Sequence, residues 1–214
     1  MADNYLEKRY EEVFGASGGH KSAPSRPGLD VLLLRNRSYR GYDKSYVVHR
    51  RQLDAMIAVN PKVASSVNLQ RLRFRPVVKG KEADFVNAHI RLGRGLPHLL
   101  LPFPGREPEA FIVVCSTVAE NPGIDIDLGI SLQSMLLKAV EMGLGGIIIR
   151  NFDREEIREG LGLPYEPLAV VAVGKPAEKV ELVPAREGDS LAYYRRDGIH
   201  YVPKLTSEDI TIEK

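Results

Sequence analysis

The sequence predicts an α+β fold in which helices flank a mixed β-sheet. Short apolar runs of strand length occur at residues 111–115, 147–149 and 168–173. Stretches with apolar residues at helical spacing lie among these runs, so strands and helices are interspersed along the chain. The chain has 214 residues and no internal repeat, which is enough for one sizeable hydrophobic core.

The first 28 residues are expected to lie outside this core. Residues 4–14 have apolar side chains at roughly helical spacing and predict a short helix. Residues 15–28 are rich in Gly, Ser and Pro, a composition typical of a flexible connector. We therefore expect two parts: an N-terminal helix with its connector over residues 1–28, and the domain proper over residues 29–214.

The first part of the domain is expected to be helical. Residues 29–35 predict a short helix because of their dense leucines. Residues 38–43 contain Gly41 and several polar groups, which favour a loop. A second helical face, which stops before Pro61, carries Leu53, Met56 and Ile57.

Residues 72–78 predict the first strand. Arginine alternates there with apolar residues, which is the pattern of a half-buried strand, and Pro76 places the strand at an edge or a bulge. Residues 79–109 show no clear period, and we expect an active-site cover or an excursion toward an interface.

The three apolar runs named above predict interior strands, and a strong helix is expected between the first two. Its range is residues 127–142, and its apolar stripe is formed by Leu128, Leu132, Met135, Leu136, Ala139 and Val140. A last helix is expected over residues 153–160. There Asp153 can cap the first turn and Glu156 has the capping-box spacing, while glycines end the helix.

Composition excludes several functional classes. The net charge of +2 is too small to indicate nucleic-acid binding, since such domains usually carry a strong basic excess. No apolar run approaches the roughly 20 residues that span a bilayer, and the charged N-terminus lacks the apolar stretch of a signal peptide. The one cysteine, Cys115, lies in an apolar run and is expected to be buried and inert. These features predict a cytoplasmic protein that contacts neither membrane nor nucleic acid.

Most candidate chemical motifs have a simpler interpretation. The five histidines do not occur at the spacings that place two metal ligands on one helix face, so we expect no metal site. The glycines at 143–146 follow a helix and precede a strand, whereas a dinucleotide-binding turn needs the strand first. We interpret them as a helix C-terminal stop.

One group of cations has two open interpretations. Arg35, Arg37 and Arg40 surround Ser38, and together they could hold an anion with two guanidinium groups and a hydroxyl. The same cations could instead lie in solvent and offset the negative end of a helix dipole. Charge alone does not decide between the two.

The residues around this group resemble the nitroreductase family. Residues 37–43 (RSYRGYD) resemble its N-terminal flavin motif, an Arg-rich R-S-x-R/K-x-F/Y run. Residues 65–70 (SSVNLQ) are similar to its S-S-x-N-x-Q segment. The ordered set of matches spans roughly residues 30–205; its further members are the helix at 127–142, residues 152–176, and Pro203-Lys204.

This resemblance implies an FMN-binding, intertwined homodimer with the long helix at its interface. Arg37, Ser38 and Lys204 are the implied phosphate contacts, and Arg40 and Asn68 the implied contacts of the flavin pyrimidine. The backbone around Arg150 and Asn151 is implied to face the flavin ring. The full set of candidate cofactor-binding residues is Arg35, Arg37, Ser38, Arg40, Asn68, Gln70, Arg150, Asn151 and Lys204.

The sequence also departs from the family pattern. Asn36 stands where the family often has a basic residue, and Thr206 stands where a second cation is expected. Arg35, Arg195 and Arg196 are the available replacements.

The implied function is that of a flavoenzyme. FMN would take a hydride from NAD(P)H at N5 and reduce a small acceptor such as a nitroaromatic or a quinone, so no catalytic side chain is nominated. Arg40 is expected to tune the flavin, since a positive charge beside the pyrimidine favours the anionic reduced ring. Two alternatives stay open: a flavin storage or sensing protein without steady turnover, and a nucleic-acid-binding module that uses Arg71, Arg73 and Arg75.

Overall fold

The computed structural model describes residues 27–93, 95–96 and 99–212. The helix expected over residues 4–14 lies outside the described residues, as does nearly all of the expected connector.

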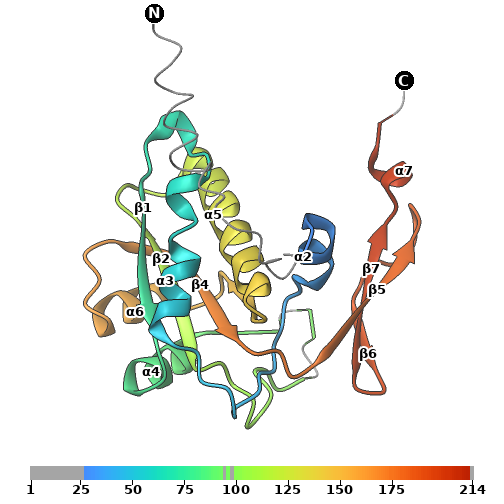
Figure 1. The fold of residues 1–214 in the computed structure, drawn as a ribbon, viewed down its shortest axis with the longest axis horizontal. Coiled ribbons are helices and arrows are strands. Elements are labelled where there is room, and N and C mark those ends of the chain that lie inside the picture. Colours follow the sequence, from blue (N-terminus) through green and yellow to red (C-terminus); the bar gives the residue numbers. More distant parts are fainter. Residues whose placement is uncertain (1–26, 94, 97–98, 213–214) are drawn as a thin grey trace, which may run out of the picture.

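A four-stranded antiparallel sheet forms the centre of the fold (Figure 1), with the order β1-β2-β4-β3. Its strands are β1 (Leu72–Val77), β2 (Ala110–Ser116), β4 (Glu166–Gly174) and β3 (Gly145–Ile149). The three predicted interior runs are therefore strands, but only β2 and β4 are interior; β3 lies at the edge of the sheet opposite β1, so the interior placement of residues 147–149 was wrong. β1 lies at an edge, as its proline predicted, because proline has no N–H to give to a second neighbour.

Helices cover both faces of this sheet. α3 (Arg50–Ile57) and α5 (Pro122–Glu141) pack on one face, and α4 (Lys81–His89) and α6 (Arg154–Gly160) pack on the other. Alternate residues of β2 serve the two cores: Ile112 lies in the first cluster and Phe111 in the second. Both faces of the strand are buried, which explains its continuous apolar run. The expected fold of helices flanking a sheet is confirmed.

Two helices differ from the sequence prediction. α5 begins at Pro122 rather than at residue 127, because the Asn121 side chain accepts hydrogen bonds from the Gly123 and Ile124 amides. α4 lies in the segment expected to be a cover or an excursion, and the prediction for residues 81–89 was wrong. Ala83 and Val86 are buried against the second core, but the helix follows Gly80 without a side-chain cap, and this hid its start.

Other local predictions are confirmed. α2 (Leu29–Arg35) and α3 occur where leucines and helical spacing placed them. Asp153 caps α6 by accepting from the Glu156 amide. Gly143 follows α5 with φ +75°, so the glycine-rich run ends a helix as interpreted.

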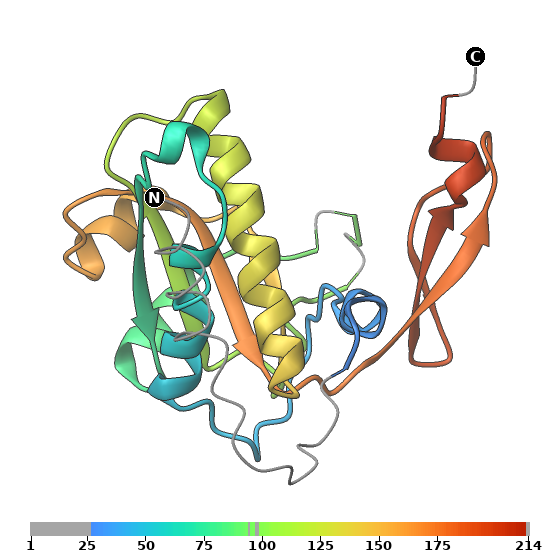
Figure 2. The same ribbon diagram turned by 45° about the horizontal axis from the view of Figure 1, so that its top comes forward.

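A second, three-stranded sheet projects from the body of the molecule (Figures 1 and 2). It contains β5 (Lys179–Ala185), β7 (Ile199–Leu205) and β6 (Tyr194–Arg196), in the order β5-β7-β6. β5 and β7 are parallel, and the short helix α7 (Ser207–Ile210) follows. We call residues 179–210 the arm, and the rest of the described chain the body. No strand was predicted in the arm.

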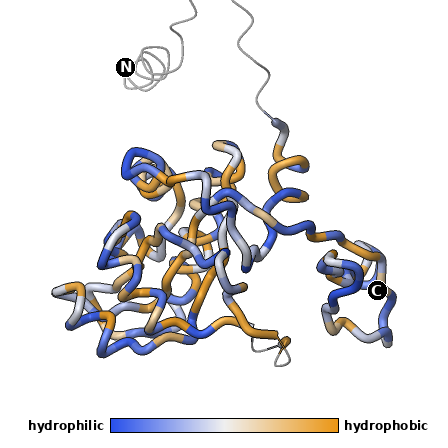
Figure 3. Tube along the Cα trace, turned by 90° about the horizontal axis from the view of Figure 1, so that it is seen from below, coloured by the Kyte–Doolittle hydropathy of each residue, from blue (hydrophilic) through white to orange (hydrophobic). Residues whose placement is uncertain are grey.

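The hydropathy of the chain differs between these parts. Figure 3 shows apolar segments gathered within the body, while the arm lies apart with mixed polarity. Short 3₁₀ helices, η1 (Asn60–Lys62) and η2 (Ser66–Asn68), connect α3 to β1 and both contact α5.

Candidate functional site

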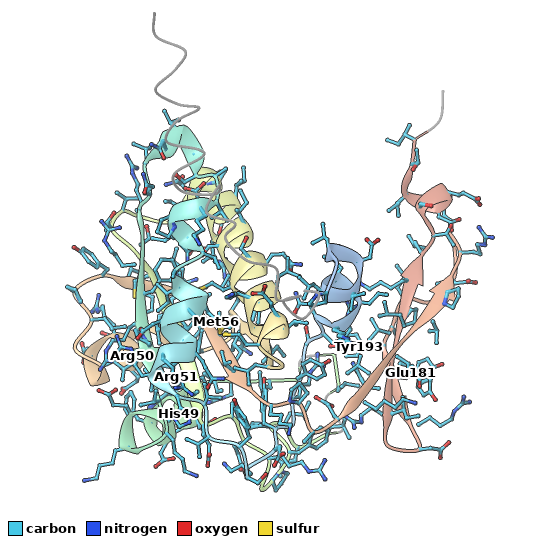
Figure 4. The ribbon with its side chains drawn as sticks, in the orientation of Figure 1. His49, Arg50, Arg51, Met56, Glu181 and Tyr193 are labelled. Carbon is cyan, nitrogen blue, oxygen red and sulfur yellow. The ribbon has the colours of Figure 1, made fainter. Side chains whose placement is uncertain are left out.

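A cavity of about 330 Å³ lies where the arm meets the loop that follows α2. Its volume is within the range of small-ligand pockets, about 300–1,000 Å³. The lining comes from α2, the loop, α5, the arm strands β5 and β7, and the residue that precedes β6: Leu33, Asn36, Arg37, Ser38, Arg40, Gln133, Val180, Tyr193, His200, Val202 and Lys204. Figure 4 shows Tyr193 at the base of the arm, close to α2.

The strand β7 presents one face to this cavity. His200, Val202 and Lys204 all line it, since side chains two residues apart in a strand point the same way. The structure therefore brings Lys204 together with Arg37, Ser38 and Arg40, four of the predicted cofactor-binding residues, although more than 160 positions separate Lys204 from Arg40 (204 against 40).

The cavity wall holds N–H donors that lack acceptors. In the described part of the chain, four buried side-chain nitrogen or oxygen atoms have no hydrogen-bond partner: Arg37 Nε, Arg40 Nε, His200 Nδ1 and Asn87 Oδ1. The first three belong to side chains that line this cavity. Buried donors are rarely left unpaired, so the arrangement suits a ligand rich in acceptor oxygens and negative charge.

Arg40 is a buried residue rather than a solvated surface group. Its side chain is 8% exposed, and Nη1 donates to the Ser38 carbonyl at 3.0 Å and approaches His200 Nε2 at 3.4 Å. The guanidinium carbon lies 5.4 Å from the centre of the Tyr193 ring, within cation–π range. Burial, and after it the positive charge of Arg40, lowers the pKa of His200 from its ordinary value.

Arg35 and Arg37 differ in which of the two interpretations of the cation group they fit. Arg37 Nη2 donates to the carbonyl of Leu33 at the end of α2, as the helix-dipole interpretation expects. Its buried Nε still lacks a partner, the residue lines the cavity, and burial lowers the pKa of its guanidinium. Arg35 is exposed in the last turn of α2 and does not line the cavity. Arg37 thus serves both the helix end and the cavity, whereas Arg35 fits the helix-end interpretation.

Glu178 joins the arm to the loop. Its side chain is only 2% exposed, and Oε1 accepts from the backbone amides of Arg40 and Gly41. The other oxygen, Oε2, accepts from Arg195 Nη1 at 2.7 Å. One buried carboxylate therefore fixes both the backbone of Arg40 and the strand β6. Sequence reasoning missed Glu178, Tyr193 and His200. For His200, the two-residue alternation that puts it on the same strand face as Lys204 was a usable signal.

Asn68 and Gln70 lie away from this cavity. Gln70 lines a second cavity of about 280 Å³, to which Ser131 of α5 also contributes. The first cavity receives Gln133 of α5, and side chains two residues apart on a helix point about 200° apart around its axis. The two groups of predicted residues therefore lie on different sides of α5 within one protomer.

The segment that carries Asn68 has an unusual backbone. Val67, Asn68 and Gln70 have φ values of +49°, +55° and +46°. A β-branched residue in the left-handed region is a genuine outlier, and such strain persists only where the surroundings or a function require it. Val67 is 87% exposed, so this strained segment is turned toward solvent.

Arg150 and Asn151 lie just after β3, near the start of α5. Arg150 forms ion pairs with Glu120 and with Asp125 at 3.2 Å, and the Asn151 carbonyl accepts from the Arg91 amide at 2.9 Å. Neither residue lines the first cavity.

The positions that depart from the family pattern have structural explanations. Thr206 caps α7 by accepting from the Asp209 amide, and Asn36 Nδ2 donates to Gln133 Oε1 at 3.2 Å on the cavity wall. Arg195 forms an ion pair with Glu178, and Arg196 lies over the Tyr201 ring. Neither of these two arginines supplies a cation to the cavity.

Other site types find no support in the described part of the chain. The arginines of β1 do not form a free basic stripe, because Arg75 pairs with Glu82 and Arg73 donates to backbone carbonyls. Among residues 27–93, 95–96 and 99–212, no group of three or more His, Cys, Asp or Glu side chains could hold a metal ion. None of the described helices combines the length and the apolarity needed to cross a bilayer.

Comparison with known proteins agrees with this architecture. The model of the nitroreductase family matches residues 33–175. A nitroreductase family protein from Streptococcus pneumoniae TIGR4 has a similar structure, with a TM-score of 0.62 and 15% identity over 87% of this chain and 100% of that chain. An FMN-dependent nitroreductase from Clostridium difficile R20291 gives a TM-score of 0.57 and 22% identity over 69% and 87%.

A third similar structure is a variant of an FMN- and NADPH-dependent nitroreductase derived from Sphigopyxis sp. strain HMH. It gives a TM-score of 0.57 and 18% identity, covering 71% of this chain and 89% of that chain. At these identities the likeness concerns the fold.

Proposed function

The chain belongs to the nitroreductase family, and we propose that it is an FMN-dependent oxidoreductase that takes electrons from NAD(P)H and passes them to a small acceptor. The observation that carries the proposal is the set of three buried N–H donors without acceptors, on Arg37, Arg40 and His200, around one cavity. The cofactors named for two of the similar structures, FMN and NADPH, support the same choice.

The residues of the cavity fit the phosphate-bearing end of FMN. Arg37 and Lys204 offer positive charge and Ser38 offers a hydroxyl, and a phosphate group supplies an acceptor oxygen for the unpaired Nε–H of Arg37. Arg40 stays the proposed partner of the flavin pyrimidine. Arg40 is held rigidly by its own contacts, so its positive charge is fixed in place before a ligand arrives.

Bound FMN would supply hydride acceptance and electron transfer, which is chemistry that side chains cannot perform. The protein would contribute orientation, charge and exclusion of water. We propose nitroaromatics and quinones as the acceptors and NAD(P)H as the electron donor.

We further propose that the working form is a homodimer. Arg37 and Arg40 lie on one side of α5, and Gln70, which donates a hydrogen bond to Asn68, lies on the other. If one flavin contacts both groups, a second copy must supply one of them. Exposed apolar side chains support such an interface: Leu29 and Leu34 on α2, Val67 and Leu69 on the strained segment, and Leu182 and Ile210 on the arm.

The visible absorption spectrum of the purified protein tests the cofactor. We expect a flavin spectrum, and chromatography after heat release should identify FMN. FAD as the sole chromophore, or a protein that cannot be loaded with FMN, contradicts the proposal. Steady oxidation of NADH or NADPH with an added quinone then distinguishes an enzyme from a flavin storage protein, which would bind FMN without turnover.

Light scattering tests the assembly. A homodimer at micromolar concentration is expected from an interface in the obligate size class. A stable, flavin-loaded monomer would show that both halves of the site are not needed together.

A further inference from the structure

We propose that His200 is a cofactor-binding residue, which donates a hydrogen bond from Nδ1 to the phosphate-bearing end of the ligand. This inference rests on the proposed function, because it takes the cavity between the arm and the loop as the phosphate end of the FMN site. Neither the sequence motifs nor the family resemblance nominated His200.

The neighbouring arginine decides which ring nitrogen carries the proton. Arg40 Nη1 lies 3.4 Å from His200 Nε2. A guanidinium group can only donate hydrogen bonds, so Nε2 must act as the acceptor and carries no proton. The neutral imidazole then has its N–H at Nδ1. Arg40 is in turn held by the Ser38 carbonyl, and its backbone is fixed by Glu178, so the tautomer is set by a rigid neighbour.

The proton on Nδ1 has no acceptor in the described part of the chain. His200 is 2% exposed, and Nδ1 is buried without a hydrogen-bond partner. The ring lines the cavity together with Arg37 and Lys204. An unpaired donor in such a place costs free energy in the free protein, and that cost is removed when a ligand oxygen accepts from it.

The other neighbours of the ring cannot serve as that acceptor. Tyr193 meets His200 edge to face, with ring centres 5.2 Å apart, and does not offer its hydroxyl to Nδ1. Glu178 uses its oxygens for Arg40, Gly41 and Arg195. A ligand oxygen is therefore the partner that this site lacks.

Two amide substitutions separate the ligand role from a packing role. In His200→Asn, the amide group lies near the former Nδ1 and can still donate to the ligand. In His200→Gln, the longer side chain places its amide near the former Nε2, where it can serve Arg40 but not the ligand. Both variants lose the ring and its contact with Tyr193, and only His200→Gln keeps a partner for Arg40. A purely structural role therefore predicts that His200→Gln loses no more FMN affinity than His200→Asn.

The experiment measures the dissociation constants of FMN and riboflavin by flavin fluorescence, using protein freed of bound flavin. We expect FMN to bind about ten- to a hundredfold more weakly to His200→Gln than to His200→Asn, which is the loss of one hydrogen bond to a charged group. Riboflavin, which lacks the phosphate, should bind both variants equally. In the wild-type protein, the ¹⁵N resonance of the Nδ1–H group should shift when FMN is added.

Each outcome has one meaning. Equal FMN affinities for the two variants, or an Nδ1 resonance that FMN leaves unchanged, overturn the role of His200 but leave the proposed function standing. A difference that is the same for riboflavin and FMN overturns the assignment to the phosphate end. Failure of the wild-type protein to bind FMN overturns the proposed function and this inference together.

Discussion

The body and the arm of this protein are held in place by different forces. In the body, residues 168–173 of β4 are completely buried between two helical layers. In the three strands of the arm, only Ala185 and His200 are buried. Apolar burial therefore stabilises the body, whereas the arm is fixed at its base mainly by polar contacts.

The cavity lies at the joint between these two regions, and both of them contribute residues to its wall. A ligand that contacts Arg37 from the body and Lys204 from the arm spans the joint. The few contacts that orient the arm, chiefly those of Glu178 and Arg195, then decide how well the two sides of the site fit together. Binding of a ligand should in turn stabilise the arm, because a ligand favours the state to which it binds.

The largest expected effect is on the core of the body. Phe111→Ala should lower the free energy of unfolding by about 3–5 kcal/mol, because it leaves a cavity in the second core. Leu182→Ala, in the half-exposed arm, should cost no more than about 0.5 kcal/mol in a monomer. Urea denaturation of both variants measures the difference. A larger, concentration-dependent loss for Leu182→Ala would show that a second copy covers the arm.

A smaller effect is expected at the joint. Glu178→Gln removes the negative charge to which Arg195 and two backbone amides donate hydrogen bonds. The free energy that holds the arm against the body should fall by about 1.5–3 kcal/mol. Hydrogen exchange of the β6 and β7 amides should accelerate, while exchange in β2 should stay unchanged.

The matched control for this change is Glu181→Gln, also in the arm. Glu181 is labelled in Figure 4 and forms an ion pair with Lys179 in solvent-exposed surroundings, where ion pairs contribute little. Equal acceleration of exchange in both variants would contradict the special role of Glu178.

The next effect concerns the two sides of the cavity. Arg37→Ala on the body side should weaken FMN binding by about one to two decades, since a charge-assisted hydrogen bond is lost. Lys204→Ala on the arm side should weaken it less, because this side chain is exposed. Arg51→Ala is the control, since this exposed arginine lies at the start of α3, far from the cavity (Figure 4). Unchanged FMN dissociation constants for Arg37→Ala and Lys204→Ala would show that the phosphate of FMN does not bind in the cavity between the arm and the body.

The smallest effect is expected at Cys115, which should not react with a thiol reagent in the native protein. Burial raises the pKa of Cys115 to about 12, so below that pH the thiol keeps its proton and is a poor nucleophile. In the native protein at pH 8, a thiol reagent should not modify Cys115 until the body unfolds. Rapid labelling of the native protein would show that β2 opens locally, and that the local stability of the body is lower at β2 than the burial of this strand indicates.

The sequence determined most of the body because its signals are local. Apolar runs such as residues 168–173 report burial on both strand faces, and Asp153 with Glu156 marks a helix start within four positions. The family motifs likewise placed Arg37, Ser38, Arg40 and Lys204 in one site, and the structure brings these four to one cavity.

Only the tertiary structure decided how the site is completed. Glu178 and the Arg40 amide are separated by 138 positions, and His200 and Arg40 by 160, so no local pattern links them. The same holds for the side of α5 on which Asn68 and Gln70 lie, which depends on the packing of the chain between α3 and β1. Local sequence encodes which side chains prefer burial, but the partner of a buried polar atom is fixed only when distant segments pack together.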